Sequence, residues 1–308
     1  MLRRLTIAIP TFNRAELVEI AVRNLMAQAN TGPRWRVLVI DNRSTDDTAA
    51  RLERLQREWT RLEVLNERRQ GLSFARNRAL DACDGGWLLF ADDECKFPPD
   101  YVDRALAIID TKAPAMFGGP VRPWYPTQPP HWYRDEYGSF SLPWLAPRAS
   151  RIYLSGGNIG FSVDALRSVG GFDPALGMSG GRIAFGEETD VEERILRRFG
   201  PDSVFYDPDF YNLHAVRPEK FRWRYLIREN FQRGVSRATV FKAAAAGTEA
   251  SRDVAVPACL RPEAGALLSG TPRVWQCFVY EKGLPLLRVV GQLWGRSRNA
   301  IFGNREGR

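Results

Sequence analysis

Short apolar runs alternate with longer amphipathic segments along the first 120 residues of the chain. The runs contain Ile, Val, Leu and aromatic residues in close succession, which is typical of strands buried on both faces of a sheet. In the segments between them, apolar residues recur at helical spacing, as Leu52, Leu55 and Trp59 do. We therefore expect strands that alternate with helices. The expected strands are residues 5–9, 37–40, 62–65, 88–91 and 115–118.

This alternation predicts an α/β fold with a mainly parallel sheet and helices on both of its faces. Ligands bind to such sheets beyond the carboxyl ends of the strands. Asp41 follows the second strand, and Asp92, Asp93 and Glu94 follow the fourth. Adjacent carboxylates repel one another unless a cation or solvent screens them. The run of three therefore indicates either a polar strand-ending loop or a divalent-metal site.

Polar residues ahead of the first two helices predict how these helices begin. Asn13 is placed to cap the first helix, with Glu16 at the capping-box position. Ser44 or Thr45 would cap the second helix, whose first turn then holds the acids at 46–47 at its positive end. Each cap would satisfy a backbone N–H that the first helical turn leaves without a partner.

Five segments, taken in order, resemble family 2 glycosyltransferases. IAIPTFNRAELV is similar to a family form with IPTYNR, and VLVIDNRSTDDT is similar to VVDDGSTDDT, with Asn42 and Arg43 in place of the commoner residues. RRQGLSFARNRALDACDGGWLLFADDE is similar to the block that leads into the family's Asp-x-Asp motif. GGNIGFSVDALRSVGGFDP and GEETDVEERILRRFG resemble the segment before the catalytic motif and the catalytic segment itself.

The resemblance implies a GT-A fold over residues 1–220, an inverting hexosyl transfer and a nucleoside-diphosphate sugar donor, with a UDP-sugar expected. It also implies a divalent cofactor, Mn²⁺ or Mg²⁺, and a glycan or lipid-linked acceptor in polysaccharide biosynthesis at the cell envelope. Because Glu stands where the family has Asp in both acidic motifs, a catalytically inactive sugar-nucleotide or glycan-binding module is an alternative. A nucleotidyltransferase is the second alternative. Such an enzyme would normally have a Gly-rich basic phosphate loop near the first strand, and PTFNRAE does not supply one.

The donor site that the resemblance implies lies at the strand ends. Asp41 would bind the uracil or another base, whereas the alternative is that it only caps a turn with Ser44. Arg76 would meet the diphosphate, or else be a surface cation near Asp81. The expected donor-binding residues are Pro10, Thr11, Phe12, Asn13, Asp41, Gly71, Arg76, Asp92 and Asp93, with Phe12 against the base and Asp92 on the ribose side.

A divalent cation would stabilise the charge on a departing diphosphate, and hard cations prefer oxygen ligands. By resemblance Asp93 or Glu94 holds the metal, and the assignment between the two is open because the family has Asp in the place of Glu94. His214 either completes the metal shell, as in several relatives, or is an ordinary packed histidine.

Inverting transfer also needs a general base for the acceptor hydroxyl. Correspondence with the family motif gives Glu188, with Asp190 and Glu187 as alternatives. On a helix, residues 187 and 190 share a face while 188 points elsewhere, so not all three acids reach the site. Acids at a helix N-terminus are also favoured by the helix dipole alone, without any catalytic role.

An aromatic stretch at residues 120–147 is expected to form the acceptor side of the site. Trp124 and Trp132 would stack on sugar rings, although core packing also accounts for such residues. Gly157 and Asn158, in the segment before the catalytic motif, complete the expected acceptor-binding set.

The region at residues 221–308 is expected to be helical and basic. From Phe241 onward, ten Lys or Arg stand against five acids, within a net charge of +8 for the whole chain. The last amphipathic segment, with Leu286, Val290 and Leu293 on one face, fits either an anionic membrane interface or a helix docked on the catalytic domain. We see no helix-turn-helix spacing or RNA-recognition motif, so no nucleic-acid partner is expected.

The cellular location is predicted from what the sequence lacks. The N-terminal apolar stretch is too short for a signal peptide, and there is no run of about 18 apolar residues that would span a membrane. The four cysteines, Cys83, Cys95, Cys259 and Cys277, form no CxxC pair. We therefore expect a cytoplasmic protein that either stays in solution or lies at the inner face of the cytoplasmic membrane.

Overall fold

The computed structural model describes residues 3–29, 32–139, 154–180, 183–244, 276 and 279–302. The chain divides into two compact units. Unit 1 consists of Met1–Trp124, Gly138–Gly181 and Glu187–Ala215, and unit 2 of Tyr125–Tyr137, Arg182–Gly186 and Val216–Arg308. The domain boundary at residue 220 stays a prediction, and Cys259 and Cys277 lie outside the described residues.

Unit 1 contains a seven-stranded sheet in the order β3-β2-β1-β4-β8-β6-β9. Neighbouring strands run parallel except at β8, which is antiparallel to both β4 and β6. All five strands expected from the apolar runs are present, and the prediction of a mainly parallel α/β sheet is confirmed. The strands are β1 (Leu5–Thr11), β2 (Trp35–Asp41), β3 (Leu62–Asn66), β4 (Trp87–Ala91), β6 (Met116–Gly118), β8 (Asn158–Ser162) and β9 (Val204–Tyr206).

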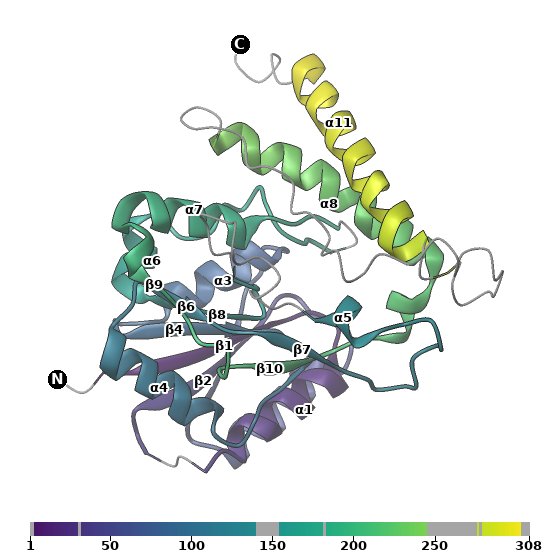
Figure 1. Cartoon of the computed structure of the whole chain (residues 1–308). Helices are drawn as coiled ribbons and strands as arrows, with labels where there is room; N and C mark the ends of the chain where they lie inside the picture. The colour runs from purple at the N-terminus through teal and green to yellow at the C-terminus, as the bar shows by residue number, and fades with distance from the viewer. Residues whose placement is uncertain are drawn as a thin grey trace. The chain divides into compact units, whose positions relative to one another are not determined.

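Two layers of helices cover the faces of this sheet (Figure 1). Alternate residues of a strand point to opposite faces, so Ile7 and Ile9 of β1 pack in one hydrophobic cluster and Ala8 in the other. The first cluster includes α1 (Ala15–Met26), α2 (Thr48–Glu58) and α4 (Tyr101–Lys112), and the second includes α3 (Leu72–Asp81), α6 (Val163–Ser168) and α7 (Glu187–Phe199). A short 3-10 helix, Pro201–Ser203, follows α7.

A second sheet of three strands lies in the same unit, in the order β5-β10-β7. Its strands are β5 (Cys95–Lys96), β7 (Val121–Trp124) and β10 (Asn212–Ala215). Strand β5 follows Glu94 directly and pairs antiparallel with β10, so that His214 lies opposite Cys95. This pairing brings a histidine that is remote in the sequence to the acids at the end of β4.

The predicted side-chain caps of α1 and α2 are wrong. Helix α1 has no side-chain cap, and Asn13, at a left-handed φ of 53°, accepts the Thr45 N–H at 2.7 Å instead. The Ser44 hydroxyl oxygen accepts the Asn13 N–H at 3.0 Å. Helix α2 begins at Thr48, whose N–H is bonded to Asp46 at 3.1 Å. Because the ends of β1 and β2 are neighbours, Asn13, Ser44 and Thr45 join the two loops to each other rather than capping their own helices.

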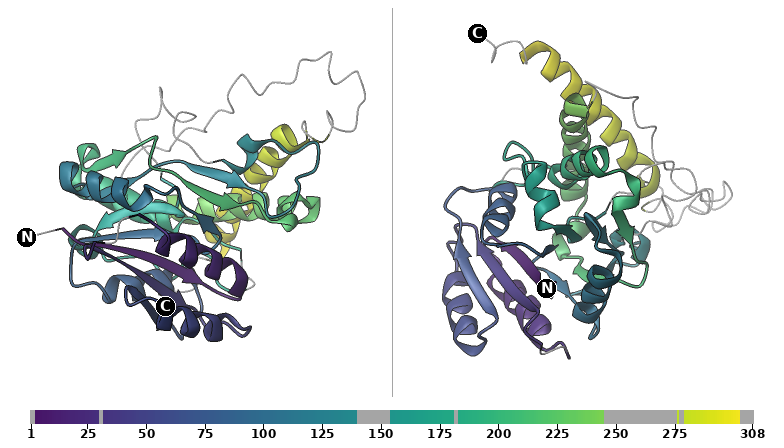
Figure 2. Two further views of the ribbon diagram at one scale, coloured as in Figure 1. Left: turned by 90° about the horizontal axis from the view of Figure 1, so that it is seen from below. Right: turned by 90° about the vertical axis from the view of Figure 1, so that its left-hand side faces the viewer.

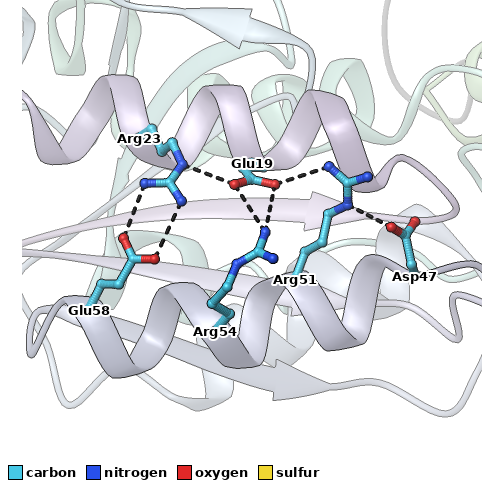
Figure 3. Close-up of polar contacts among 6 residues, drawn as sticks. All are labelled: Glu19, Arg23, Asp47, Arg51, Arg54 and Glu58. Carbon is cyan, nitrogen blue, oxygen red and sulfur yellow. Dashed lines mark hydrogen bonds and ion pairs between the residues drawn. The ribbon is translucent and has the colours of Figure 1, made fainter.

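An ionic cluster around Glu19 joins α1 to α2 (Figure 3). The Glu19 carboxylate pairs with Arg23 at 3.0 Å, Arg51 at 3.1 Å and Arg54 at 3.2 Å. Arg23 also pairs with Glu58 of α2 at 3.1 Å. A single exposed ion pair stabilises a protein by no more than about 1 kcal/mol. The contribution of this cluster is therefore to fix how the two helices lie on their face of the sheet.

Unit 2 is built around two long helices, α8 (Trp223–Ala244) and α11 (Leu284–Phe302), which lie side by side (Figure 1, Figure 2). The expectation of a helical C-terminal region is confirmed for these residues. The shorter elements are α5 (Asp135–Gly138), the 3-10 helix Pro218–Phe221 and the π-helical turn Val279–Gly283. Among the described residues, no helix has both the length and the apolar character needed to cross a membrane.

Asn158, the first residue of β8, is fully buried and connects three segments of unit 1. Its Nδ2 donates to the carbonyl oxygens of Pro120 at 3.2 Å and Phe210 at 2.9 Å. Its Oδ1 accepts the Tyr101 hydroxyl at 2.8 Å. Both amide donors are thereby used, so this side chain belongs to the core of the fold.

The Asn158→Ala substitution is expected to lower the free energy of unfolding by about 3 kcal/mol, because it leaves several buried polar groups without a partner. Urea unfolding followed by tryptophan fluorescence measures this change. Exposed Asn66, at the end of β3, provides the matched control. Asn66→Ala should change stability by less than about 0.5 kcal/mol. Equal effects of the two substitutions would contradict the structural role of Asn158.

Candidate active site

The carboxyl ends of β2, β1 and β4 are neighbours because β1 pairs with both other strands. Thr11, the last residue of β1, donates its hydroxyl hydrogen to Asp93 Oδ2 at 2.7 Å. Asp41, the last residue of β2, is buried and accepts the Ser44 N–H at 2.9 Å. The turn contact considered as an alternative for Asp41 is therefore present. This contact occupies Oδ1 of Asp41. Binding of a nucleotide base by Asp41 stays a prediction.

Arg14 neutralises two of the strand-end acids, and the sequence analysis missed it. Its Nη1 lies 2.6 Å from Asp93 Oδ1 and 3.2 Å from Glu94 Oε2. Both carboxylates are buried, with 3% of each residue exposed. Burial by itself would lower the pKa of the Arg14 guanidinium, but the charges of Asp93 and Glu94 raise the pKa above its ordinary value. Arg14 stands in the IPTFNR segment, which was the only indication that the sequence offered.

His214 lies against two further carboxylate oxygens of the acidic run. Its Nε2 is 3.3 Å from Asp92 Oδ2 and 3.1 Å from Glu94 Oε1. Its Nδ1 is 3.1 Å from the carbonyl oxygen of Ala215, which can only accept, so Nδ1 carries a hydrogen. Nε2 therefore faces two carboxylates either as a protonated nitrogen or as a lone pair. A hydrogen or a cation at this point would link the nitrogen to the two carboxylate oxygens.

The donor atoms of Asp92, Glu94 and His214 fit a divalent cation. Ligands about 2.1 Å from an octahedral cation lie about 3 Å from one another, close to the 3.1 and 3.3 Å that separate Nε2 from the two oxygens. Carboxylate oxygen suits Mg²⁺ and Mn²⁺, and imidazole is a common additional ligand. Among the described residues, no group of three or more His, Cys, Asp or Glu side chains is arranged to hold a metal ion by itself. A cation at this point would therefore need further ligands, such as the oxygens of a diphosphate.

Two of the expected acceptor-side residues contact this acidic cluster. A Cβ atom at Gly157 would lie 2.6 Å from Asp92 Oδ2, so only glycine allows the carboxylate to approach the backbone here. Trp124 donates its indole N–H to the Glu94 carbonyl oxygen at 3.0 Å. The Lys96 ammonium lies 3.8 Å from the centre of the Trp124 ring. The acceptor roles of Gly157 and Trp124 stay predictions.

Arg76 is a buried cation that lies next to a second acidic group, formed by Glu187 and Glu188. It is 2% exposed, and its Nη1 lies 2.9 Å from Glu187 Oε1. Its guanidinium also lies 5.6 Å from the ring centre of Phe90 and 5.3 Å from that of Phe172. The alternative of a surface cation near Asp81 is therefore wrong, because α3 directs this side chain into the protein. Its expected contact with a diphosphate stays a prediction.

Glu187 and Glu188, the first residues of α7, both approach Arg76. Glu188 Oε2 lies 3.9 Å from Arg76 Nη1, and a Cβ atom at Gly156 would lie 3.3 Å from Glu188 Oε1. The expectation that residue 188 points away from residue 187 is not met, because both side chains reach this guanidinium from the first turn of the helix. Glu187 is buried, whereas the Glu188 side chain is 25% exposed. Burial, and then the charge of Glu188, raise the pKa of Glu187 to about 8, although Arg76 opposes the change.

Asp190 and Glu192 anchor α7 to neighbouring segments. Asp190 pairs with Arg194 at 2.6 Å, and Arg194 donates to the Gly171 carbonyl oxygen at 2.7 Å. Glu192 is fully buried and accepts the Leu154 N–H at 2.8 Å. Burial raises the pKa of Glu192 well above its ordinary value. The sequence analysis did not identify Glu192, although an acid next to apolar Val191 was an indication of unusual burial.

Asn42 organises the loop before α3. Its Oδ1 accepts the Gly71 N–H at 2.7 Å, and its Nδ2 donates to the Arg69 carbonyl oxygen at 2.7 Å. Gly71 has a φ of 146°, which favours glycine. Of the other expected donor residues, Pro10 and Phe12 are half-buried and Asn13 is exposed. Their contacts with a donor stay predictions.

The side chains of Asn158 and Trp132 are both occupied by core contacts within their own units. The Asn158 amide lies in the core, with the contacts described above. Trp132 belongs to unit 2, where it stacks on Trp223 with ring centres 5.1 Å apart and packs against Leu226 and Leu284. Core packing, the alternative considered for the aromatic stretch, therefore accounts for Trp132.

Comparison with known proteins gives the chain its relatives. Residues 6–170, more than half of the chain, match the family model described as Glycosyl transferase family 2. The chain is 27% identical over 258 residues to the succinoglycan biosynthesis protein ExoM of Rhizobium meliloti (strain 1021). This match covers 81% of this chain and 79% of ExoM. It is 29% identical over 122 residues to glycosyltransferase AglE of Haloferax volcanii, where the match covers 39% of this chain and 40% of AglE. The chain thus spans less than half of that relative.

Among solved structures, the chain is similar to the mannosyltransferase PcManGT from Pyrobaculum calidifontis in complex with GDP-Man and Mn²⁺. The TM-score is 0.59 at 19% identity, over 99% of this chain and 76% of that chain. At this identity the likeness shows the fold alone, and the expected GT-A fold is confirmed. The family match includes the strands that carry the acidic run. It therefore favours a glycosyltransferase over the two alternatives, a nucleotidyltransferase and an inactive binding module. The chain belongs to glycosyl transferase family 2.

Proposed function

We propose that the chain transfers a sugar, with inversion, from a nucleoside-diphosphate donor to a hydroxyl of a glycan or lipid-linked acceptor, in a reaction that requires a divalent cation. The observation that carries this proposal is the position of His214 Nε2, at 3.3 Å from Asp92 and 3.1 Å from Glu94, beyond the end of β4. Sheets of this kind bind ligands at that edge. A UDP-sugar remains the expected donor.

Asp92, Glu94 and His214 would hold the cation, Mn²⁺ or Mg²⁺. When bound, such a cation stabilises the negative charge that develops on a departing diphosphate. Asp93 would contribute less directly, because Thr11 and Arg14 already bond its two oxygens at 2.7 and 2.6 Å. Burial raises the pKa of Asp93, and the charge of Arg14, at 2.6 Å from Asp93 and 3.2 Å from Glu94, opposes that rise and favours carboxylate oxygens of the kind that a hard cation needs.

Glu188 would act as the general base that removes the proton from the acceptor hydroxyl. It is the more exposed member of the Glu187–Glu188 pair. Glu187 is buried against Arg76, and its raised pKa of about 8 leaves it largely protonated at neutral pH. Glu187 is therefore poorly suited to accept a proton there. Asp190 is engaged by Arg194 at 2.6 Å, so both alternatives are positioned to support the helix rather than to reach a substrate.

The acceptor class is proposed from the relatives. ExoM is described as a succinoglycan biosynthesis protein, so a growing surface polysaccharide is a suitable acceptor for this chain as well. If the polysaccharide is assembled on a lipid carrier, it is presented at the inner face of the cytoplasmic membrane.

His214→Ala should lower the Mn²⁺-dependent affinity for a nucleoside diphosphate by at least about tenfold, because the substitution removes one proposed ligand. Isothermal titration of UDP and GDP, each with and without Mn²⁺, measures the effect. The chain has one other histidine, exposed His131, and His131→Ala provides the matched control. Equal Mn²⁺-dependent affinity in the two variants would exclude His214 as a ligand.

Glu188→Gln should lower the rate of sugar transfer by about 10²- to 10⁴-fold, because an amide retains the shape but cannot accept the proton. Nucleotide affinity in Mn²⁺ should remain close to that of the unmodified protein. Transfer is measured as donor-derived nucleoside diphosphate released in the presence of acceptor. If Glu188→Gln retained normal turnover while Asp190→Asn lost it without unfolding, the base would be Asp190.

A further inference from the structure

Helix α11 exposes a continuous apolar stripe. The exposed fractions are 66% for Leu286, 48% for Val289, 53% for Val290, 57% for Leu293 and 61% for Trp294. At about 100° per residue these five side chains occupy an arc of about 140° on one side of the helix. Single exposed apolar residues are ordinary on protein surfaces, but a contiguous stripe indicates a binding surface. The three residues expected on one face, Leu286, Val290 and Leu293, are all exposed, whereas the neighbouring Leu287 packs against the core of unit 2.

The opposite side of α11 is fixed against α8. Leu284 is buried against Trp132 and Leu226. A Cβ atom at Gly291 would overlap the Phe231 carbonyl oxygen, and one at Gly295 would lie 2.9 Å from the Ala238 Cβ. The two backbones therefore approach closely along the side that carries the glycines. This packing leaves the apolar stripe facing away from α8, and rotation of the helix cannot bury it there without losing these contacts.

Helix α11 and its neighbour α8 are strongly basic. The sequences of α8 and α11 contain eight Arg or Lys and a single acid, Glu229. Helix α11 contributes three arginines and no acid. Arg296, one of the three, is exposed and lies beside the stripe on the helix surface. An anionic surface would be attracted to this region over a distance of about 10 Å at 0.1 M salt.

We infer that this α11 stripe, formed by Leu286, Val289, Val290, Leu293 and Trp294, docks on an anionic phospholipid bilayer. The helix would lie in the plane of the interface, with the stripe among the upper acyl chains and Arg296 at the phosphates. Trp294 suits this depth, because the amphipathic indole prefers the headgroup region. The inference does not rest on the proposed glycosyl transfer and concerns a different surface.

A second copy of the chain is the competing occupant of the stripe. Two copies that met through α11 would bring two regions of like charge together, at an electrostatic cost that nothing in the described residues offsets. A bilayer with acidic headgroups instead supplies the opposite charge and an apolar interior together. The charge of the two helices therefore favours lipid over self-association.

The test uses the full-length chain and sedimentation with vesicles of phosphatidylcholine, with or without phosphatidylglycerol. Leu286→Gln, Leu293→Gln and Trp294→Gln combined should weaken binding to the anionic vesicles by at least about tenfold, because three apolar side chains leave the bilayer. The matched control combines Ile20→Gln, Met178→Gln and Phe199→Gln, which are exposed apolar residues of unit 1 with exposed fractions of 39%, 37% and 42%. The control should bind as the unmodified chain does, and circular dichroism verifies the fold of both variants.

Three results bear on the inference. Weaker binding of the unmodified chain when phosphatidylglycerol is omitted or salt is raised supports it. Failure of the unmodified chain to bind anionic vesicles, or equal binding by the two triple variants, overturns it. A dimer in light scattering that the stripe variant abolishes, without any vesicle binding, identifies a second copy as the occupant instead.

Discussion

The site depends on neutralising carboxylates that the fold buries at the carboxyl edge of its sheet. Asp93 and Glu94 lie almost fully out of water, where an unpaired ionised group would cost several kcal/mol. Arg14 reaches one oxygen of each acid, at 2.6 and 3.2 Å, and His214 lies at the remaining side of Glu94. These contacts allow a cluster of acids to persist in a folded protein while some of its oxygens remain available to a ligand.

This arrangement constrains the rest of unit 1. Arg14 is placed by the end of β1, which must lie next to β4 for the guanidinium to reach Asp93. His214 is placed by β10, which pairs with the short strand that follows Glu94. Gly157 must lack a side chain, because a Cβ atom there would meet Asp92 at 2.6 Å. Residues from four separate parts of the chain therefore depend on one another through the charge of a single acidic run.

The sequence predicted the parts of this structure that follow local rules. Strands β1, β2 and β4 contain short apolar runs, and the acids that end β2 and β4 are visible without any tertiary information. Strand β8 escaped because its sequence, NIGFS, has a glycine in the middle and polar residues at both ends, so that no apolar run marks it. The Asn13 cap failed because the adjacent loop offered Asn13 a better partner, in Thr45, than its own helix did. Arg14 and Glu192 escaped for the same reason, since their partners are set by the fold and not by spacing.

The pair Glu187 and Glu188 illustrates why a motif does not by itself assign a chemical role. The two residues are chemically identical and adjacent, and both face Arg76, at 2.9 and 3.9 Å. The difference between them is solvent. Glu187 has lost almost all contact with water, so the neighbouring charge of Glu188 raises its pKa, whereas Glu188 keeps a quarter of its side chain exposed. Two like charges so close together cannot both ionise at neutral pH without a large cost, and of the two acids it is the buried Glu187 whose pKa is raised. Burial therefore decides which of the two acids is available to accept a proton.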